Sequence, residues 1–88
     1  MVKIKFFANL RHITKTQEIL LAQEGTVGDI LEILLGINDE FKKVIFNENG
    51  DIYINILLNG RNIEYLNNLE TRVRHEDTLY LFPPVAGG

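Results

Sequence analysis

Six residues at the end of the printed sequence have types and an order that could serve chemistry: Pro83, Pro84, Val85, Ala86, Gly87 and Gly88. Proline fixes φ and forces the preceding Phe82 into an extended conformation, so the chain should leave its last strand stiff and straight. The residues after the prolines are small, and the glycines have no side chain, so the backbone can enter a slot too narrow for ordinary residues. Extended, the six residues reach roughly 20 Å at ~3.3 Å per residue. We predict a tail that enters the active site of another protein.

The reactive group of this tail would be the carboxylate of Gly88. An α-carboxyl group has a reference pKa of about 3.3–3.7, so it is ionised at neutral pH and can attack a phosphorus centre. A carboxylate is a poor acyl donor until it is activated, because its leaving group would be oxide. The chain has no cysteine, so any sulfur that it carries must sit on the backbone terminus. We expect partner proteins to supply the positioning and the electrostatics of the reaction.

Composition places the chain among small globular proteins. Its 88 residues predict one domain with a single modest core. The net charge of −3 gives no basic field, so nucleic acid is not an expected partner. The sequence has no cysteine, no apolar run of membrane-spanning length and no leader pattern, so we expect a soluble cytoplasmic protein. His12 and His75 lack the spacing of metal ligands, and no metal site is predicted.

Apolar and charged residues alternate at the start of the chain, which predicts a strand over residues 2–7. Its inward side chains would be Val2, Ile4 and Phe6. Phe7 would then fall on the solvent side. Residues 16–22 are predicted to form the return strand of a hairpin with a loose loop.

A helix start follows, with Thr26 as the N-cap and Asp29 three residues later, where an acid favours the positive end of the helix. Residues 30–35 supply an apolar stripe broad enough to lie across a sheet. We predict that Gly36 is the C′ residue that ends this helix. Helical spacing also predicts a short second helix over about residues 40–46.

The clearest strand signal covers residues 52–58, where every second residue is a large aliphatic one. Asn59-Gly60 is a strong hairpin turn signal, so a short paired strand should begin at Arg61. A polar connection over residues 67–77 follows. Its predicted apolar anchors are Leu69 and Val73.

The final strand is predicted over residues 78–82, with Leu79 and Leu81 inward. The first and last strands have the most hydrophobic inner faces, which suits neighbours at the centre of a mixed sheet. An amphipathic helix must cover that sheet. The predicted fold is therefore α+β, a β-grasp (ubiquitin-like) domain over residues 1–82 with about five strands and one main helix. A flexible tail over residues 83–88 follows it.

Five apolar or aromatic residues fall on the outward side of the predicted strands, where a sheet wet on one face normally has polar residues. They are Phe7, Tyr53, Leu57, Tyr80 and Phe82. On adjacent strands they would form an exposed patch beside the root of the tail, which is a suitable protein-binding surface. The alternative is that the strand register differs, or that residues 37–50 cover them.

Several landmarks resemble a known family along nearly the whole chain. Residues 5–11, Lys-Phe-Phe-Ala-Asn-Leu-Arg, look like the opening of the small subunit of molybdopterin synthase, a ubiquitin-like sulfur carrier. Asn59-Gly60 after a strand, residues 76–79 and the tail match later landmarks of the same family. The chain departs from the family in its long segment over residues 36–49 and in His75, where such proteins often have glycine.

The resemblance implies a specific reaction sequence for Gly88. A ubiquitin-activating-like enzyme would adenylate its carboxylate with ATP, and the adenylate would be converted to a thiocarboxylate, with a sulfurtransferase as a candidate sulfur source. The tail would then insert into the large subunit of molybdopterin synthase. There the sulfur would pass to the cyclic pyranopterin precursor of the molybdenum or tungsten cofactor. By the same resemblance, the chain is expected to bind no cofactor itself and not to be catalytic alone.

Two other functions share the fold and the tail. A protein modifier would join Gly88 to lysines of target proteins through an isopeptide bond, and this function can coexist with sulfur transport in one chain. A thiamine-pathway sulfur carrier is a further interpretation, although such carriers are usually shorter and seldom have Phe-Pro-Pro before the glycines. An interaction module without C-terminal chemistry would leave the Gly-Gly pair unexplained.

Overall fold

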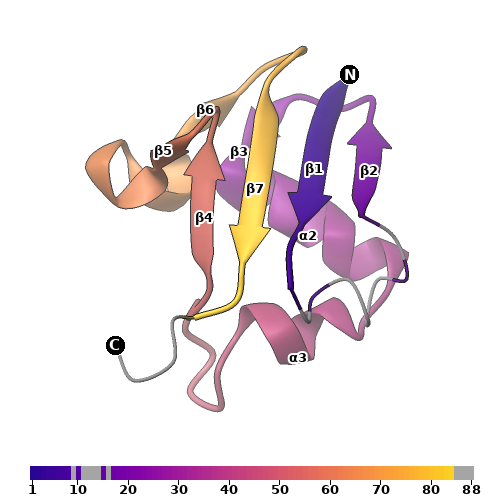
Figure 1. Ribbon diagram of the computed structural model, residues 1–88, viewed down its shortest axis with the longest axis vertical. Helices are drawn as coiled ribbons and strands as arrows, with labels where there is room; N and C mark the ends of the chain where they lie inside the picture. Colours follow the sequence, from indigo (N-terminus) through magenta and orange to yellow (C-terminus); the bar gives the residue numbers. More distant parts are fainter. Residues whose placement is uncertain (9, 11–14, 16, 85–88) are drawn as a thin grey trace.

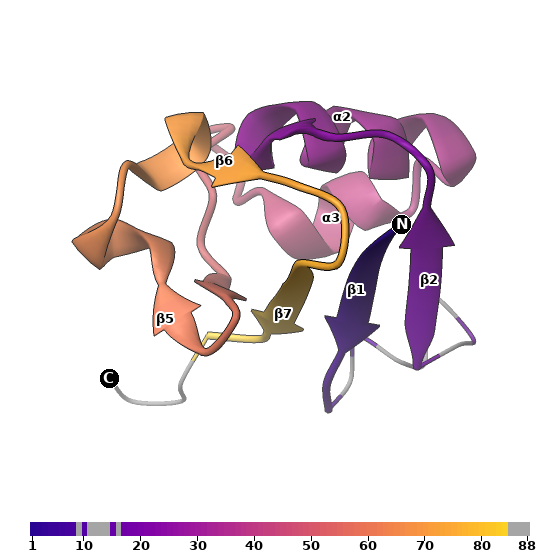
Figure 2. The ribbon, with the colours of Figure 1, turned by 90° about the horizontal axis from the view of Figure 1, so that it is seen from above.

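Two layers make up the structure, a five-stranded sheet and the helices on one of its faces (Figure 1). The computed structural model describes residues 1–8, 10, 15 and 17–84. Seen from above, α2 and α3 lie on the same side of the sheet (Figure 2). The other face carries no covering layer within the described part of the chain. This arrangement confirms the predicted α+β fold with a mixed sheet and one main helix.

The central sheet has the strand order β2-β1-β7-β4-β5. Its strands are β1 (Val2–Phe6), β2 (Glu18–Leu21), β4 (Asn55–Leu58), β5 (Arg61–Asn62) and β7 (Thr78–Phe82). The strands β1 and β7 are parallel, and the other pairs of this sheet are antiparallel. The predicted placement of the first and last strands as central neighbours is confirmed.

Alternate residues of the central strands face the helices and are almost fully buried. On the sheet these residues are Val2, Ile4, Phe6, Ile56, Leu79 and Leu81. On helix α2 (Val27–Ile37) the buried residues are Val27, Ile30, Leu31 and Leu34. Burying each such aliphatic or aromatic side chain contributes about 1.5–3 kcal/mol. The contact between sheet and helix is therefore the main source of stability.

Helix α2 begins where the capping pattern predicts. The hydroxyl of Thr26 accepts a hydrogen bond from the backbone N–H of Asp29 at 3.1 Å. The carboxylate of Asp29 accepts one in return from the N–H of Thr26 at 3.0 Å. These two bonds form a capping box, which satisfies two backbone donors that the helix start leaves unpaired.

We expect the contribution of Asp29 to stability to be lost in acid. Hydrogen bonds from Thr26, backbone first, and the nearby Arg72 guanidinium hold the pKa of the Asp29 carboxyl below its ordinary 3.8, against some desolvation. Because the folded pKa is the lower one, this stabilisation is present above pH 3.8 and is lost as the pH falls through the folded value. Thermal melts of wild-type and Asp29→Asn protein should differ at about pH 6 and converge in acid. A difference that persists unchanged in acid would contradict this role.

The predicted end of this helix at Gly36 is wrong. The helix continues to Ile37 and ends at Asn38, whose extended backbone breaks the helix and whose N–H still bonds to the carbonyl of Leu34 at 3.1 Å. A C′ glycine takes a left-handed conformation, and Gly36 does not have a positive φ. Gly36 is therefore an exposed helical residue near the end of α2.

The predicted second helix is confirmed as α3 (Phe41–Ile45). Its Phe41 and Ile45 are buried, and the Phe41 ring stacks on Phe6 with 5.5 Å between centroids. Helix α3 therefore packs on the helix side of the sheet and leaves the opposite face uncovered. The described helices are all too short or too polar to cross a bilayer.

The strand predicted over residues 52–58 is shorter than expected, since β4 begins at Asn55. Ile52 forms only an isolated bridge with Phe46, and the chain bends at Ile54 before the ladder starts. The Asn59-Gly60 turn is confirmed, and Asn59 (φ 52°) and Gly60 (φ 91°) both have the positive φ of a type I′ hairpin.

A second, smaller sheet was not predicted. The short strands β3 (Gly25–Thr26) and β6 (Arg72–Val73) form a second, two-stranded sheet. The connection over residues 67–77 contains the 3-10 helix η2 (Asn68–Glu70), and η1 (Ile63–Tyr65) precedes it.

Val73 is a fully buried anchor as predicted, but Leu69 is 41% exposed and the prediction for it is wrong. Leu10, in the predicted loop, joins the core.

Candidate functional site

The two central strands bring Phe7 and Phe82 together at the root of the tail. Because β1 and β7 are parallel, their carboxyl ends lie at the same edge of the sheet (Figure 1). The N–H of Phe7 donates to the carbonyl of Leu81 at 3.2 Å. The rings of Phe7 and Phe82 are stacked, with 4.3 Å between centroids and 9° between planes. Residues far apart in sequence thus form one aromatic surface where the strand ends.

Two further predicted residues extend this surface across the sheet. The Tyr80 ring stacks on Phe7 with 6.0 Å between centroids. Leu57 on β4 lies directly opposite Tyr80 in the strand register, so both side chains point to the same face. We call Phe7, Leu57, Tyr80 and Phe82 the aromatic face. All four are half-buried, and they lie on the side of the sheet away from the helices.

Tyr53, the fifth predicted member, does not join the aromatic face. It precedes β4, and its N–H donates to the carbonyl of Ile45 at 3.2 Å. Its hydroxyl donates to the carbonyl of Lys43 at 3.4 Å, which places the side chain against α3. The continuous alternation of residues 52–58 concealed the bend at Ile54, so no signal in the sequence marks this position.

The described part of the tail is its two prolines. Pro83 is half-buried and Pro84 is exposed. Val85, Ala86, Gly87 and Gly88 lie outside the described residues. The described residues therefore define the point from which the tail departs, at the end of β7 and beside the aromatic face.

The opposite end of β7 is anchored by a network that the sequence did not reveal. The Asn59 side chain donates from Nδ2 to the carboxylate of Asp77 at 2.9 Å, and its Oδ1 accepts the N–H of Thr78 at 2.9 Å. The second carboxylate oxygen of Asp77 accepts the N–H of Arg74 at 2.8 Å. Asn59 was predicted only as a turn residue. It also fixes the start of the strand that ends in the tail.

The described residues contain no group of three or more His, Cys, Asp or Glu side chains that could hold a metal ion. The N–H of His75 donates to the carboxylate of Glu24 at 2.7 Å, and the His75 ring lies 3.7 Å from the same carboxylate. His75 thus ties two loops together. His12 lies outside the described residues.

Comparison with known proteins places this geometry in a family. The ThiS family model matches residues 4–88. Small archaeal modifier protein 3 of Haloferax volcanii is 32% identical over 91 residues, which cover 99% of this chain and 98% of the relative.

Two solved structures have the same architecture along their whole length. The solution structure of small archaeal modifier protein 1 from Methanosarcina acetivorans is 41% identical, with a TM-score of 0.83, and the match covers 99% of this chain and 95% of that one. A chain in the crystal structure of the BexX/CysO complex from Amycolatopsis orientalis is 27% identical, with a TM-score of 0.82 and full coverage of both chains. The chain described here therefore belongs to the ThiS family of ubiquitin-like sulfur carriers and modifiers.

Proposed function

We propose that the chain is the sulfur-carrying small subunit of a molybdopterin synthase, acting in the cytoplasm with a thiocarboxylate on Gly88. The observation that carries this proposal is the stack of Phe7 on Phe82, which puts a pair of half-buried aromatic rings at the residue from which the tail departs. A partner bound to the aromatic face would be held beside the tail, so docking and delivery would be coupled. The Pro-Pro spacer, the Gly-Gly end and membership of the ThiS family support the same interpretation.

The proposed chemistry requires several partner proteins that act one after another. On an adenylating enzyme that resembles ubiquitin-activating enzymes, a carboxylate oxygen of Gly88 attacks the α-phosphorus of ATP and pyrophosphate leaves. A hydrosulfide ion then attacks the carbonyl carbon, AMP leaves with the carbonyl-bound oxygen, and Gly88 becomes a thiocarboxylate. A sulfurtransferase would be the source of this sulfur, with a thiol as the reductant that releases it from the persulfide as hydrosulfide. The large synthase subunit receives the thiocarboxylate and passes the sulfur to the pyranopterin precursor. The contribution of this chain is to present its terminal carbonyl, while the partners supply the electrostatic stabilisation.

Protein modification is the second candidate, and similarity to the two small archaeal modifier proteins favours it. The activated carbonyl would be the same, but a lysine amine of a target protein would replace AMP and form an isopeptide bond. The aromatic face would again hold the partner that handles the tail.

Mass spectrometry of the intact chain tests the carrier function. After incubation with its adenylating enzyme, ATP and a sulfur donor, we expect the C-terminal peptide to gain the mass difference between sulfur and oxygen. Omission of ATP is the control, because sulfur cannot replace an oxygen of the Gly88 carboxylate unless that carboxylate has first been activated. An unchanged mass with an enzyme that forms the adenylate would count against a carrier role.

Affinity purification from the native cell distinguishes the two pathways. Recovery of a large synthase subunit with the tagged chain is the result expected for the pterin pathway. A ladder of covalent conjugates that disappears on deletion of Gly88 is the result expected for a modifier. Both results together would assign both functions to one chain.

A further inference from the structure

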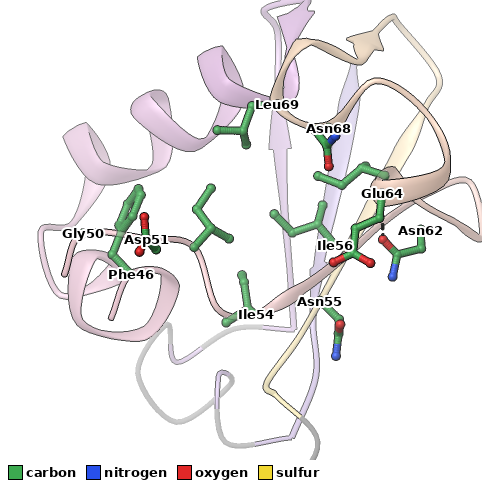
Figure 3. A pocket seen from close by; sticks show the side chains of 12 residues that line it. Phe46, Gly50, Asp51, Ile54, Asn55, Ile56, Asn62, Glu64, Asn68 and Leu69 are labelled. Carbon is green, nitrogen blue, oxygen red and sulfur yellow. Dashed lines mark hydrogen bonds between the residues drawn. The ribbon is translucent and has the colours of Figure 1, made fainter. Parts of the chain in front are cut away.

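A hollow of about 280 Å³ lies on the helix side of the sheet, beside β4 and η1 (Figure 3). We call it the β4 hollow. Its floor is made by Ile54, Ile56 and Ile63, and its rim includes Asp51, Asn55 and Glu64. The three isoleucines are between 2% and 8% exposed, so the floor is a continuation of the core. The β4 hollow takes no part in the aromatic face, whose side chains point to the other side of the sheet.

The rim carries two carboxylates and no cation. Asp51 and Glu64 lie on opposite sides of the β4 hollow, with isoleucine side chains between them (Figure 3). Both residues are exposed, and neither carboxylate is ion-paired or hydrogen-bonded to another described residue. Among the described residues that line the hollow, none is lysine, arginine or histidine. The rim is therefore complementary to positive charge.

Backbone contacts hold both acidic residues in place while their carboxylates stay free. The N–H of Glu64 donates to Oδ1 of Asn62 at 2.9 Å, which caps η1. The N–H of Asp51 donates to Oδ1 of Asn47 at 3.0 Å, and its carbonyl accepts the N–H of Asn47 at 2.8 Å. The two charges therefore sit on fixed backbone on either side of an apolar floor.

The size and lining of the β4 hollow select the kind of group that fits. Pockets for small molecules usually enclose about 300–1,000 Å³, and the β4 hollow, at about 280 Å³, lies at the small end of this range and has room for one long side chain. Lysine and arginine bury an aliphatic stem on apolar surface while the charged end reaches polar groups. An apolar floor between two free carboxylates matches that combination.

The position of the β4 hollow connects it to the tail. Asn55 lines the hollow and is also the register partner of Phe82 in the adjacent strand. The hollow therefore lies on β4, the strand next to the one that ends in the tail, but on the face of the sheet opposite the aromatic face. A protein that encloses the root of the tail from both faces of the sheet would also cover the hollow. We propose that the β4 hollow receives a lysine or arginine side chain of that protein, an inference that rests on the proposed function of the tail.

Titration with small cations, followed by amide NMR of the full chain, tests the binding step without any partner. The probes are n-butylammonium and n-butylguanidinium, with n-butanol as the neutral control. We expect the cations to bind with a Kd on the order of millimolar and to shift the amides of Ile54, Asn55 and Glu64. Asp51→Asn combined with Glu64→Gln should weaken cation binding about tenfold, about threefold for each carboxylate, and leave n-butanol unaffected. Glu32→Gln, an exposed acid on α2 outside this lining, is the matched control and should change nothing.

Two outcomes of this titration would overturn the inference. One is equal binding of n-butanol and the cations, and the other is cation binding that the double variant retains. Amide shifts at the β4 hollow that depend on protein concentration, without a probe, would instead identify a second copy of the chain as the occupant. This too would overturn the inference.

The adenylation assay then tests whether the partner uses the site. The double variant should raise the KM for the chain about tenfold and leave kcat unchanged, because the two rim charges would contribute to binding of the chain and not to the chemical step. An unchanged KM would overturn the inference even if the cations bind. If the wild-type chain is not adenylated at all, the proposed function has failed. This failure can be told apart from failure of the inference about the β4 hollow, because the NMR titration does not require Gly88 to react.

Discussion

Deleting Gly88, or making the substitution Gly87→Trp, will abolish thiocarboxylate formation and conjugation while leaving thermal unfolding nearly unchanged. The deletion moves the reactive carbonyl one residue back along the chain, so it no longer reaches the position that the partner's active site has fixed. The tryptophan blocks a slot that only a backbone without side chains can enter. The measurements are the mass of the C-terminal peptide after reaction with the adenylating enzyme and the thermal midpoint of the free chain.

The matched control is Gly36→Trp. Gly36 is exposed on α2 and lacks a positive φ, and a Cβ atom there would lie more than 4 Å from every described atom outside its own stretch of helix. A bulky residue therefore fits at this position, and the variant should react as the wild type does. Surface changes away from caps, turns and the core usually alter the free energy of unfolding by less than about 0.5 kcal/mol. A large drop in the thermal midpoint of the Gly88 deletion would mean that the tail is part of the fold, and our interpretation of it would be wrong.

Phe82→Ser will weaken binding of the adenylating enzyme or of the large synthase subunit by about 30-fold, because truncating a central aromatic anchor of an interface typically costs about 2 kcal/mol or more. The serine removes the ring at the root of the tail and also leaves Phe7 without its stacking partner at 4.3 Å. Binding should be measured by calorimetry, or as KM in the adenylation assay with kcat determined separately.

Tyr53→Ser is the control for this prediction, since Tyr53 lies against α3 and outside the aromatic face. It removes an exposed aromatic ring of similar size and should leave partner affinity unchanged. Loss of the ring pair should cost Phe82→Ser about 0.5–1.5 kcal/mol of stability beyond the area effect, so folding of each variant must be checked by NMR. Equal affinity of folded Phe82→Ser and wild type would exclude the aromatic face as a docking surface.

Local interactions explain which predictions the sequence supported. The start of α2 follows from Thr26 and Asp29, which bond to each other within one helical turn. The hairpin turn follows from Asn59 and Gly60, whose tolerance of positive φ does not depend on distant residues. The final strand, β7, is bounded as its alternation predicts. In each case the signal and the structure lie within a few residues of each other.

Contacts between distant segments explain what the sequence left undecided. The pairing of β3 with β6, the burial of Leu10 and the anchoring of Asp77 by Asn59 each join residues far apart in the chain. The placement of Tyr53 against α3 depends on a bend that the alternating pattern does not encode.

The candidate site also has one part that the local sequence predicts and one part that depends on contacts between distant segments. The order of residues 82–88 by itself predicts that the chemistry belongs to the terminal carbonyl of Gly88. Only the tertiary structure decided that Phe7, from the other end of the chain, stacks on Phe82, because the parallel pairing of β1 with β7 brings their carboxyl ends to one edge. Covalent chemistry can be read from residue types, whereas a docking surface exists only once the strands have paired.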